Sequence, residues 1–391
     1  MGYNGFEEQE ERLEKGFLES LPEVNRRHVR RHLEYMRARG MHPRTLMKHI
    51  YCLKEFFDCL GRDADAKKAT RKEMEKAMAK LESGRLSTET RRNIRAITKA
   101  FYKHLTGEDI HYPMEVAWIK TSQKSSKRML PEDILSENEV IRMLDAAKNQ
   151  RDKAIVALLF DSGIRMGELM GLRIKDLQFE GELAHVVVNG KTGMRKIPLM
   201  FSVPYLSQYL NANRKRKPGD PLWLDIGSWS KKNKVPDYAA IRKRLQEIGK
   251  DAGINKRIYP HLFRHSRATF YANRLTEQQL KAFFGWTGGS AMASTYVHLS
   301  GRDLDNSILK AYGISAAVEE TKPKLTAREC PRCRNKNELD AVYCSSCGAP
   351  MEIQNAVRLA GESEKSREAL LSSIKDPELL DKIVDLLVSL Q

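Results

Sequence analysis

Residues 259–270 read YPHLFRHSRATF, and this stretch decides how the rest of the chain is interpreted. Pro260 suits the first turn of a helix, where its missing N–H would have no intrahelical acceptor. His261 and Arg264 are then three residues apart and project from one face of that helix. His265 falls on another face, where a packed, hydrogen-bonded structural histidine is expected. Because the string His-x-x-Arg-His also arises by chance, its meaning depends on the segments around it.

Two segments that precede this helix carry further charged residues. In ALLFDSGIRMGELMGL, residues 157–172, Arg165 follows a glycine turn and Glu168 lies one helical turn later on the same face. Such a pair is usually a plain surface ion pair. In LAHVVVNGKTGMRKIPL, residues 183–199, two β-rich runs flank a turn with Asn-Gly and Gly, which predicts a hairpin with Lys191 in its turn. Exposed lysines are common in such turns, so neither segment indicates a function by itself.

A short aromatic segment follows the same helix. Gly285 and Trp286 come after an amphipathic helix, and Tyr296 lies ten residues further on, in a short helix that Ser290 can cap. A lone tryptophan normally belongs to a core, although its indole N–H is a donor that needs a partner. Most of the 13 tyrosines are expected to be structural. Taken singly, none of these residues points to chemistry.

Taken together, these boxes resemble those of the tyrosine recombinase (phage integrase) family in order and separation. They read GIRMGEL, GKTGMRKIPL, HLFRH and GW…STYVH. The resemblance covers residues 130–315 specifically and the N-terminal helices, as the core-binding domain of the family, less specifically. It implies a site-specific recombinase or integrase that cleaves and rejoins DNA through a 3′-phosphotyrosyl intermediate. Integration, excision or resolution would then proceed without ATP.

The resemblance also implies roles for charged residues at the matching positions. Arg165 and Arg264 look like the pair that clamps the scissile phosphate, because fixed guanidinium groups can meet the extra negative charge of the transition state. His261 looks like the proton-handling group beside them. Lys191 resembles the general acid for the leaving 5′-oxygen, and Glu168 the supporting acid of the family.

The remaining roles fall on His265 and on the aromatic segment. Tyr296 looks like the nucleophile, and His265 looks like a supporting residue. At the position of Trp286 many relatives carry histidine, which is a departure from the pattern. An indole N–H can supply a hydrogen bond there, but it cannot transfer a proton at neutral pH.

The balance of charges favours a nucleic acid as the partner. The chain has 68 Lys and Arg against 51 Asp and Glu, a formal net charge of +17. Such an excess attracts polyanions such as double-stranded DNA, although ribosomal and membrane-surface proteins share it. The family implies self-assembly into a tetramer on two DNA sites.

No run of about 18 apolar residues is present, so no membrane contact is expected. A cytoplasmic location, nucleoid-associated in a prokaryote, is expected.

The fold class predicted is mainly α with a small antiparallel β-sheet. At 391 residues the chain is too long for one core. Capping-box signatures at residues 70–73 and 136–139 mark two helix starts, and later helices are predicted at 237–250, 261–274, 277–284, 291–298 and 302–311. The predicted parts are an N-terminal helical core-binding (SAM-like) DNA-binding domain (7–118), a basic linker (119–133), a mixed α/β tyrosine recombinase catalytic domain (134–315), a zinc ribbon (324–351) and C-terminal amphipathic helices (362–391).

Four cysteines form two C-x-x-C pairs, Cys330 with Cys333 and Cys344 with Cys347. Two such pairs close together provide four thiolates for one tetrahedral zinc ion, and four cysteine ligands leave no open position. One structural Zn²⁺ is therefore predicted, with reduced free thiols as the alternative. No phosphate-cradling Gly-Lys-Ser/Thr loop and no carboxylate cluster for two metals is visible, so no cofactor is expected for catalysis.

Two other functions stay open on the sequence alone. The first is a type IB topoisomerase, which cuts and reseals one strand by related chemistry. The second is an inactive recombinase scaffold that serves as a DNA-binding regulator. The complete set of matching residues favours the recombinase over the regulator, and the N-terminal helical domain with its linker favours it over the topoisomerase.

Overall fold

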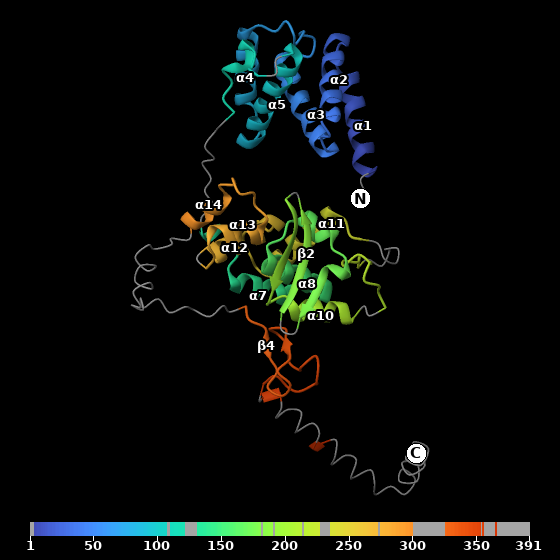
Figure 1. The fold of residues 1–391 in the computed structure, drawn as a ribbon, viewed down its shortest axis with the longest axis vertical. Coiled ribbons are helices and arrows are strands. Elements are labelled where there is room, and N and C mark those ends of the chain that lie inside the picture. Colours follow the sequence, from blue (N-terminus) through green and yellow to red (C-terminus); the bar gives the residue numbers. More distant parts are fainter. Residues whose placement is uncertain are drawn as a thin grey trace. The chain divides into compact units, whose positions relative to one another are not determined.

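The computed structural model of the protein divides the chain into two compact units, Met1–Arg128 (unit 1) and Met129–Gln391 (unit 2). Unit 1 is the blue to cyan part of Figure 1, and unit 2 follows it along the colour bar. The structure describes residues 4–107, 110–121, 131–180, 183–190, 192–212, 215–226, 235–272, 274–299, 325–352, 354–355 and 364–365.

Unit 1 is a bundle of helices whose ends coincide with local signals in the sequence. Pro43 is the first residue of α3, and Gly61, with a φ of 103°, follows its last residue. Thr70 and Glu73 form the predicted capping box at the start of α4. One hydrophobic cluster fills the centre of the bundle. The helices are α1 (Asn4–Glu19), α2 (Glu23–Ala38), α3 (Pro43–Leu60), α4 (Arg71–Ser83), α5 (Thr88–Thr106) and the short α6 (Met114–Ala117).

Unit 2 is built around α8 (Gln150–Ser162). Nearly all its side chains are buried, as expected for a helix that is covered on every side. Helices α7, α10 and α12 and strand β3 pack against it. The described helices are η1 (Pro131–Asp133), α7 (Glu137–Ala146), α8, α9 (Met166–Gly171), η2 (Ile174–Asp176), α10 (Val203–Asn211), α11 (Tyr238–Asp251), α12 (Pro260–Ala272), α13 (Glu277–Phe284) and α14 (Met292–Leu299).

A three-stranded antiparallel sheet, in the order β1-β2-β3, contains the predicted hairpin. Pairing of β2 (Leu183–Gly190) with β3 (Gly193–Leu199) continues to Gly190 opposite Gly193. The sequence placed Asn189, Gly190 and Gly193 in the turn, but the first two belong to β2 and Gly193 to β3, so residues 191–192 connect the strands. Strand β1 (Leu177–Glu180) adds an edge that the sequence did not predict.

The helices predicted beyond the sheet are present where the structure describes them. Helices α11 to α14 match the first four predicted ranges within about two residues. Ser290 accepts a hydrogen bond from the backbone N–H of Met292 (3.3 Å) at the start of α14, as predicted. The predicted helix at 302–311 lies outside the described residues, as do most of the linker and the C-terminal helices. Within the described ranges, every helix is too short or too polar to cross a membrane.

The cysteine-containing segment, residues 325–352, packs on the rest of unit 2. It holds β4 (Arg328–Glu329) and β5 (Lys336–Asn337). The backbone N–H of Leu339 donates to the Tyr205 hydroxyl of α10 (3.2 Å), and Lys153 of α8 forms an ion pair with Asp340 (2.5 Å). Leu325 belongs to the main hydrophobic core of the unit. The fold is therefore mainly α with small antiparallel sheets, which confirms the predicted class.

Candidate active site

The carboxylate of Glu168 lies at the centre of a charged network at the start of α9. Arg165 precedes the helix, and its backbone N–H donates to Glu168 Oε2 (2.8 Å) while its Nη1 donates to Oε1 (3.0 Å). The Glu168 side chain is only 4% exposed. The predicted i, i+3 pair is therefore present, and it is buried at Glu168, unlike an ordinary surface ion pair.

Arg195 of β3 completes this network, and the sequence analysis did not single it out. Its Nη1 and Nη2 donate to the two carboxylate oxygens of Glu168 (2.9 and 2.8 Å), and its Nε donates to the carbonyl oxygen of Phe283 (3.1 Å). Gly190 lies so close that a Cβ there would be 2.3 Å from Glu168 Oε1. A Cβ at this position would therefore displace the Glu168 carboxylate.

Strand alternation was the signal that could have found Arg195. Side chains two residues apart along a strand share a face, so Arg195 lies on the same face as Ile197 and Leu199. The side chains of Ile197 and Leu199 are both fully buried. A cation on the buried face of a hairpin needs a charged partner, and Glu168 is the partner that the structure provides.

The charge on Glu168 follows from these contacts. Burial alone would raise the pKa of its carboxyl group, but the hydrogen bonds from Arg195 and Arg165 outweigh burial and hold the pKa at about 2. Glu168 is therefore an anion across the physiological range. Its role in this geometry is to orient two guanidinium groups.

The Gly285 carbonyl joins the hairpin to the Arg165 network. It accepts hydrogen bonds from Arg165 Nη2 (3.0 Å) and from Thr192 Oγ1 (3.2 Å), a residue of the hairpin turn. Gly285 ends α13 with a φ of 58°, and a Cβ there would lie 2.9 Å from Arg195 Nη1. Both the backbone conformation and the close approach require glycine.

Arg264, on α12, is 4% exposed and is held by two backbone carbonyls. Its Nη1 donates to Gly163 (3.0 Å) and its Nη2 to Phe284 (2.5 Å). The guanidinium also lies over the Phe284 and Trp286 rings, 5.0 and 5.5 Å from their centroids. Burial, with Arg165 and other nearby cations, lowers the pKa of Arg264 to about 9, which leaves it charged at neutral pH.

Tyr296, on α14, is buried next to this cation. Its ring stacks parallel to Trp286, with the centroids 5.5 Å apart and an interplanar angle of 1°. Its hydroxyl is hydrogen-bonded to Nδ1 of His265. Burial raises the pKa of Tyr296 to about 12, although the charge of Arg264 opposes this shift. The phenol is therefore protonated in the free protein.

The two histidines of α12 differ in their contacts. His265 was expected to be a structural histidine on another face of the helix, and it is hydrogen-bonded, but its partner is the hydroxyl of Tyr296. Burial and the neighbouring His261 and Arg264 lower the pKa of His265 to about 4. Partial burial and the charges of Arg264 and Arg165 lower the pKa of His261. Both rings are thus favoured in the neutral form.

The predicted general acid, Lys191, lies outside the described residues, so its role stays a prediction. Gly190 and Thr192, its neighbours in the chain, are described, and both lie against the Glu168 and Gly285 network. The hairpin thus brings the chain on either side of residue 191 to the site.

A second buried ion pair holds α12 to α8, and sequence reasoning missed it as well. Arg267, one turn beyond Arg264, donates from Nη2 to Asp161 Oδ1 (3.0 Å) and from Nε to the Asp161 carbonyl (2.9 Å). Asp161 Oδ2 accepts from the backbone N–H groups of Met200 and Ser202 (2.9 and 3.0 Å). These contacts fix the helix that carries His261 and Arg264.

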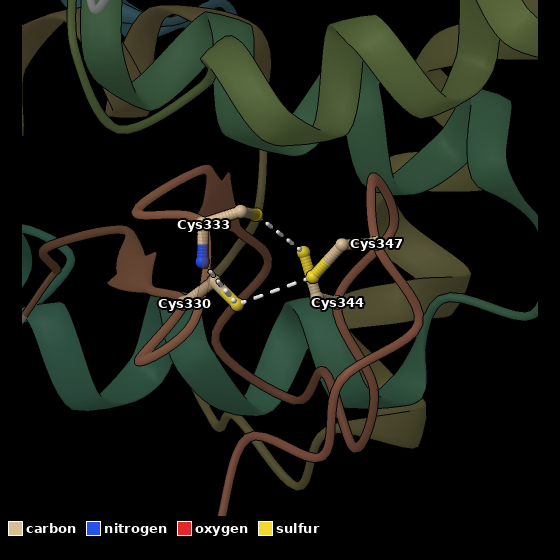
Figure 2. Close-up of side chains that lie close together, drawn as sticks. All are labelled: Cys330, Cys333, Cys344 and Cys347. Atoms are coloured by element: carbon tan, nitrogen blue, oxygen red, sulfur yellow. Dashed lines mark hydrogen bonds between the residues drawn. The ribbon is translucent and has the colours of Figure 1, made fainter.

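The four cysteines predicted to bind metal lie together in residues 330–347, and their sulfur atoms face one another (Figure 2). All four Sγ atoms are within 4.8 Å of one another. The Cys330–Cys347 and Cys333–Cys344 sulfur pairs are 3.7 and 3.6 Å apart, far beyond the ~2.0 Å of a disulfide. Backbone N–H groups of Cys333 and Ser346 donate to Cys330 and Cys344 sulfur (3.5 and 3.4 Å).

Comparison with known proteins agrees with this geometry. The model of the phage integrase family matches residues 133–302, and that of the phage integrase N-terminal SAM-like domain matches residues 29–112. Tyrosine recombinase XerA of Pyrococcus horikoshii is 28% identical over 61% of this chain and 78% of that protein. Tyrosine recombinase XerC of Lactobacillus delbrueckii subsp. bulgaricus is 31% identical over 52% of this chain and 69% of that protein.

A solved structure shows the same fold. A lambda integrase dimer bound to a core site has a TM-score of 0.55 and 16% identity, and the match covers 71% of this chain and 96% of that one. The chain belongs to the phage integrase family of tyrosine recombinases. It is a site-specific recombinase, an enzyme that breaks and rejoins DNA.

Proposed function

We propose that Tyr296 attacks a phosphodiester of double-stranded DNA. The phenolic oxygen would bond to phosphorus as the bond to the 5′-oxygen breaks, which leaves a 3′-phosphotyrosyl link and a free 5′-hydroxyl. Attack by a 5′-hydroxyl from another strand would reverse the step. The covalent link conserves the energy of the phosphodiester, so rejoining needs no ATP. The observation that carries this proposal is that Tyr296 and Arg264 both lie against the Trp286 indole.

Two guanidinium groups are available for the phosphate. A guanidinium carries five N–H donors, and protein acceptors engage one each on Nη1 and Nη2 of Arg165 and of Arg264 in the described residues. The protein contacts therefore fix the orientation of both groups without using all their donors. Charge-assisted hydrogen bonds to the non-bridging oxygens would stabilise the developing negative charge. In this proposal Arg165 and Arg264 form the phosphate clamp, and the Trp286 N–H is a further donor.

Two protons must move during cleavage, one away from Tyr296 and one onto the 5′-oxygen. The neutral His265 ring can accept a hydrogen bond from the Tyr296 hydroxyl and orient it for attack. His261 lies beside the clamp, and we assign it to proton handling near the phosphate. Lys191 is proposed to protonate the leaving 5′-oxygen, since an alkoxide is a poor leaving group.

The direct test is Tyr296→Phe, which removes one oxygen and keeps the ring that stacks on Trp286. The probe is a nicked suicide substrate made from the DNA that flanks the gene. The wild type should form a covalent protein–DNA adduct and Tyr296→Phe none, while both bind the DNA equally. Tyr238→Phe, at an exposed position of the same unit, is the matched control and should form the adduct normally. A normal adduct from Tyr296→Phe would contradict the assignment.

We further propose that Cys330, Cys333, Cys344 and Cys347 bind one structural zinc ion. Tetrahedral ligands at a Zn–S distance of ~2.3 Å are about 3.8 Å apart, close to the 3.7 and 3.6 Å between the paired sulfurs. Backbone N–H groups directed at two of the sulfurs also suit thiolates. With four protein ligands, the ion would hold the segment together and would have no open position for catalysis.

The number of copies that act together follows from the chemistry of strand exchange between two duplexes. Recombination between two duplexes requires four strands to be cut, and each cut occupies one tyrosine. We therefore propose that four copies of the chain act together on two DNA sites. The net charge of +17 supports tight contact with the duplex backbone. Because the substrate is DNA, we propose a cytoplasmic location, associated with the nucleoid in a prokaryote.

A further inference from the structure

Arg195 joins three parts of the active site that are far apart in the sequence. Its backbone is in β3, opposite Val188 and close to the hairpin turn. Its guanidinium reaches Glu168 on α9 and the Phe283 carbonyl at the end of α13. Three described acceptors therefore hold one side chain, which is only 10% exposed. At this burial, the contacts of Arg195 are with the protein itself.

The contacts of Arg195 fix the orientation of the Glu168 carboxylate that it binds. Two parallel N–H···O bonds to one carboxylate fix its plane as well as its position. The same carboxylate receives the Arg165 backbone and side chain. Any rotation of the Glu168 carboxylate would therefore move the Arg165 guanidinium. Glu168 Oε1 also lies close to Gly190, where an added Cβ would be only 2.3 Å away.

We propose that Arg195 is a positioning residue of the recombination reaction. By holding both oxygens of Glu168 it fixes the Arg165 guanidinium, and it ties the turn end of the hairpin that contains Lys191 to the same point. The inference rests on the proposed role of Arg165 as a phosphate clamp. It assigns Arg195 no contact with the reacting atoms.

Arg195 also keeps Glu168 ionised. The described charged groups that act on this carboxylate are Arg195 from β3, Arg165 from the start of α9 and, on α12, Arg264. Burial raises the pKa of Glu168, and the two hydrogen bonds of Arg195 are the largest opposing contribution. Without them the pKa of Glu168 should rise. Arg165 would then lose its anionic partner as the pH falls.

The experiment compares Arg195→Gln with the wild type in single-turnover formation of the covalent adduct on the suicide substrate, at saturating full-length protein. We expect a rate about 10²-fold lower, the effect of moving a substrate-positioning group by about 1 Å. We also expect the ratio of the variant rate to the wild-type rate to fall further from mildly alkaline to mildly acidic pH. DNA affinity should remain close to that of the wild type.

Two further variants separate positioning from a general loss of structure. Lys196→Gln changes the next residue of β3, whose side chain pairs with Glu180 at the surface, and it should react as the wild type does. In Arg195→Gln combined with Glu168→Gln, no carboxylate remains to titrate, so the rate ratio should not change with pH. A ratio near one for Arg195→Gln, or a lowered ratio that is independent of pH, would overturn the proposal.

Arg195→Lys covers the case in which Arg195→Gln does not fold. Lysine keeps the charge next to Glu168 but cannot form two parallel hydrogen bonds. The variant should therefore be slow, with a ratio that changes little with pH. A wild-type rate from Arg195→Lys would also overturn the proposal. Absence of adduct from the wild type itself would contradict the proposed function instead, so the two failures are distinguishable.

Discussion

The Asp161–Arg267 pair gives a stability prediction whose size follows from its contacts. Asp161→Ala removes a carboxylate with a 1% exposed side chain. Its Oδ2 accepts from Met200 N, Ser202 N and Ser202 Oγ at 2.9 to 3.0 Å, and its Oδ1 accepts from Arg267. The variant leaves the buried Arg267 cation without its anion, which costs about 3–5 kcal/mol. That is a large share of the roughly 5–15 kcal/mol that stabilises a domain.

Urea unfolding monitored by tryptophan fluorescence measures this effect. The chain has four tryptophans, and only Trp118 lies in unit 1, so a Trp118→Phe background makes the signal report on unit 2. Asp237→Ala is the control, because this exposed N-cap of α11 accepts one hydrogen bond, from Ala240 N, and its loss should cost only about 1 kcal/mol.

Removing the cation as well should restore part of the stability. In Asp161→Ala combined with Arg267→Met, no buried charge is left unpaired, although Met200 and Ser202 still lose their acceptor. The double variant should therefore unfold at a higher urea concentration than Asp161→Ala alone. Asp161→Ala could lower the free energy of unfolding by no more than Asp237→Ala does, or Arg267→Met could lower it further by a similar amount. Either result would mean that the ion pair is not what holds α12 against α8.

Two further predictions concern proton transfer and zinc. Lys191→Ala should slow cleavage by roughly 10²–10⁴-fold and recover most of its rate when sulfur replaces the bridging 5′-oxygen, because the thiolate leaves without an acid. Arg264→Ala should not recover, since its proposed partners are the non-bridging oxygens, and equal rescue of both variants or of neither would contradict the role of Lys191. Purified protein should contain about one zinc ion per chain, and Cys344→Ser should lose it and speed hydrogen exchange in residues 325–352 while adduct formation remains measurable. Retention of a full zinc complement by that variant would exclude the four-cysteine site.

Local patterns were enough to predict much of the framework. The positions of Pro43 and Gly61 delimit α3, and the capping box of Thr70 and Glu73 starts α4. The hairpin, the helix of His261 and Arg264 and the helix of Tyr296 were predicted in the same way. These signals act within a few residues, since caps, turns and side-chain periodicity depend on near neighbours in the chain.

Local signals could not predict the hydrogen-bond and ion-pair partners of several residues. The sequence indicated that Glu168 supports the site, but its bidentate contact is with Arg195, on a strand 27 residues away. His265 was expected to be hydrogen-bonded, but its partner Tyr296 could not be named. Arg267 and Asp161 are 106 residues apart, and neither was singled out.

By itself, therefore, the sequence determined many of the described helices, the hairpin, the two cysteine pairs and, through the order of its motifs, the family. Only the tertiary structure decided which buried charges meet and which carbonyl oxygens hold the two arginines of the proposed clamp. The reason is physical. Helix and strand formation follow from local spacing, whereas the partner of a buried cation depends on how α8, α9, α12 and β3 pack, and no spacing within one segment records that packing.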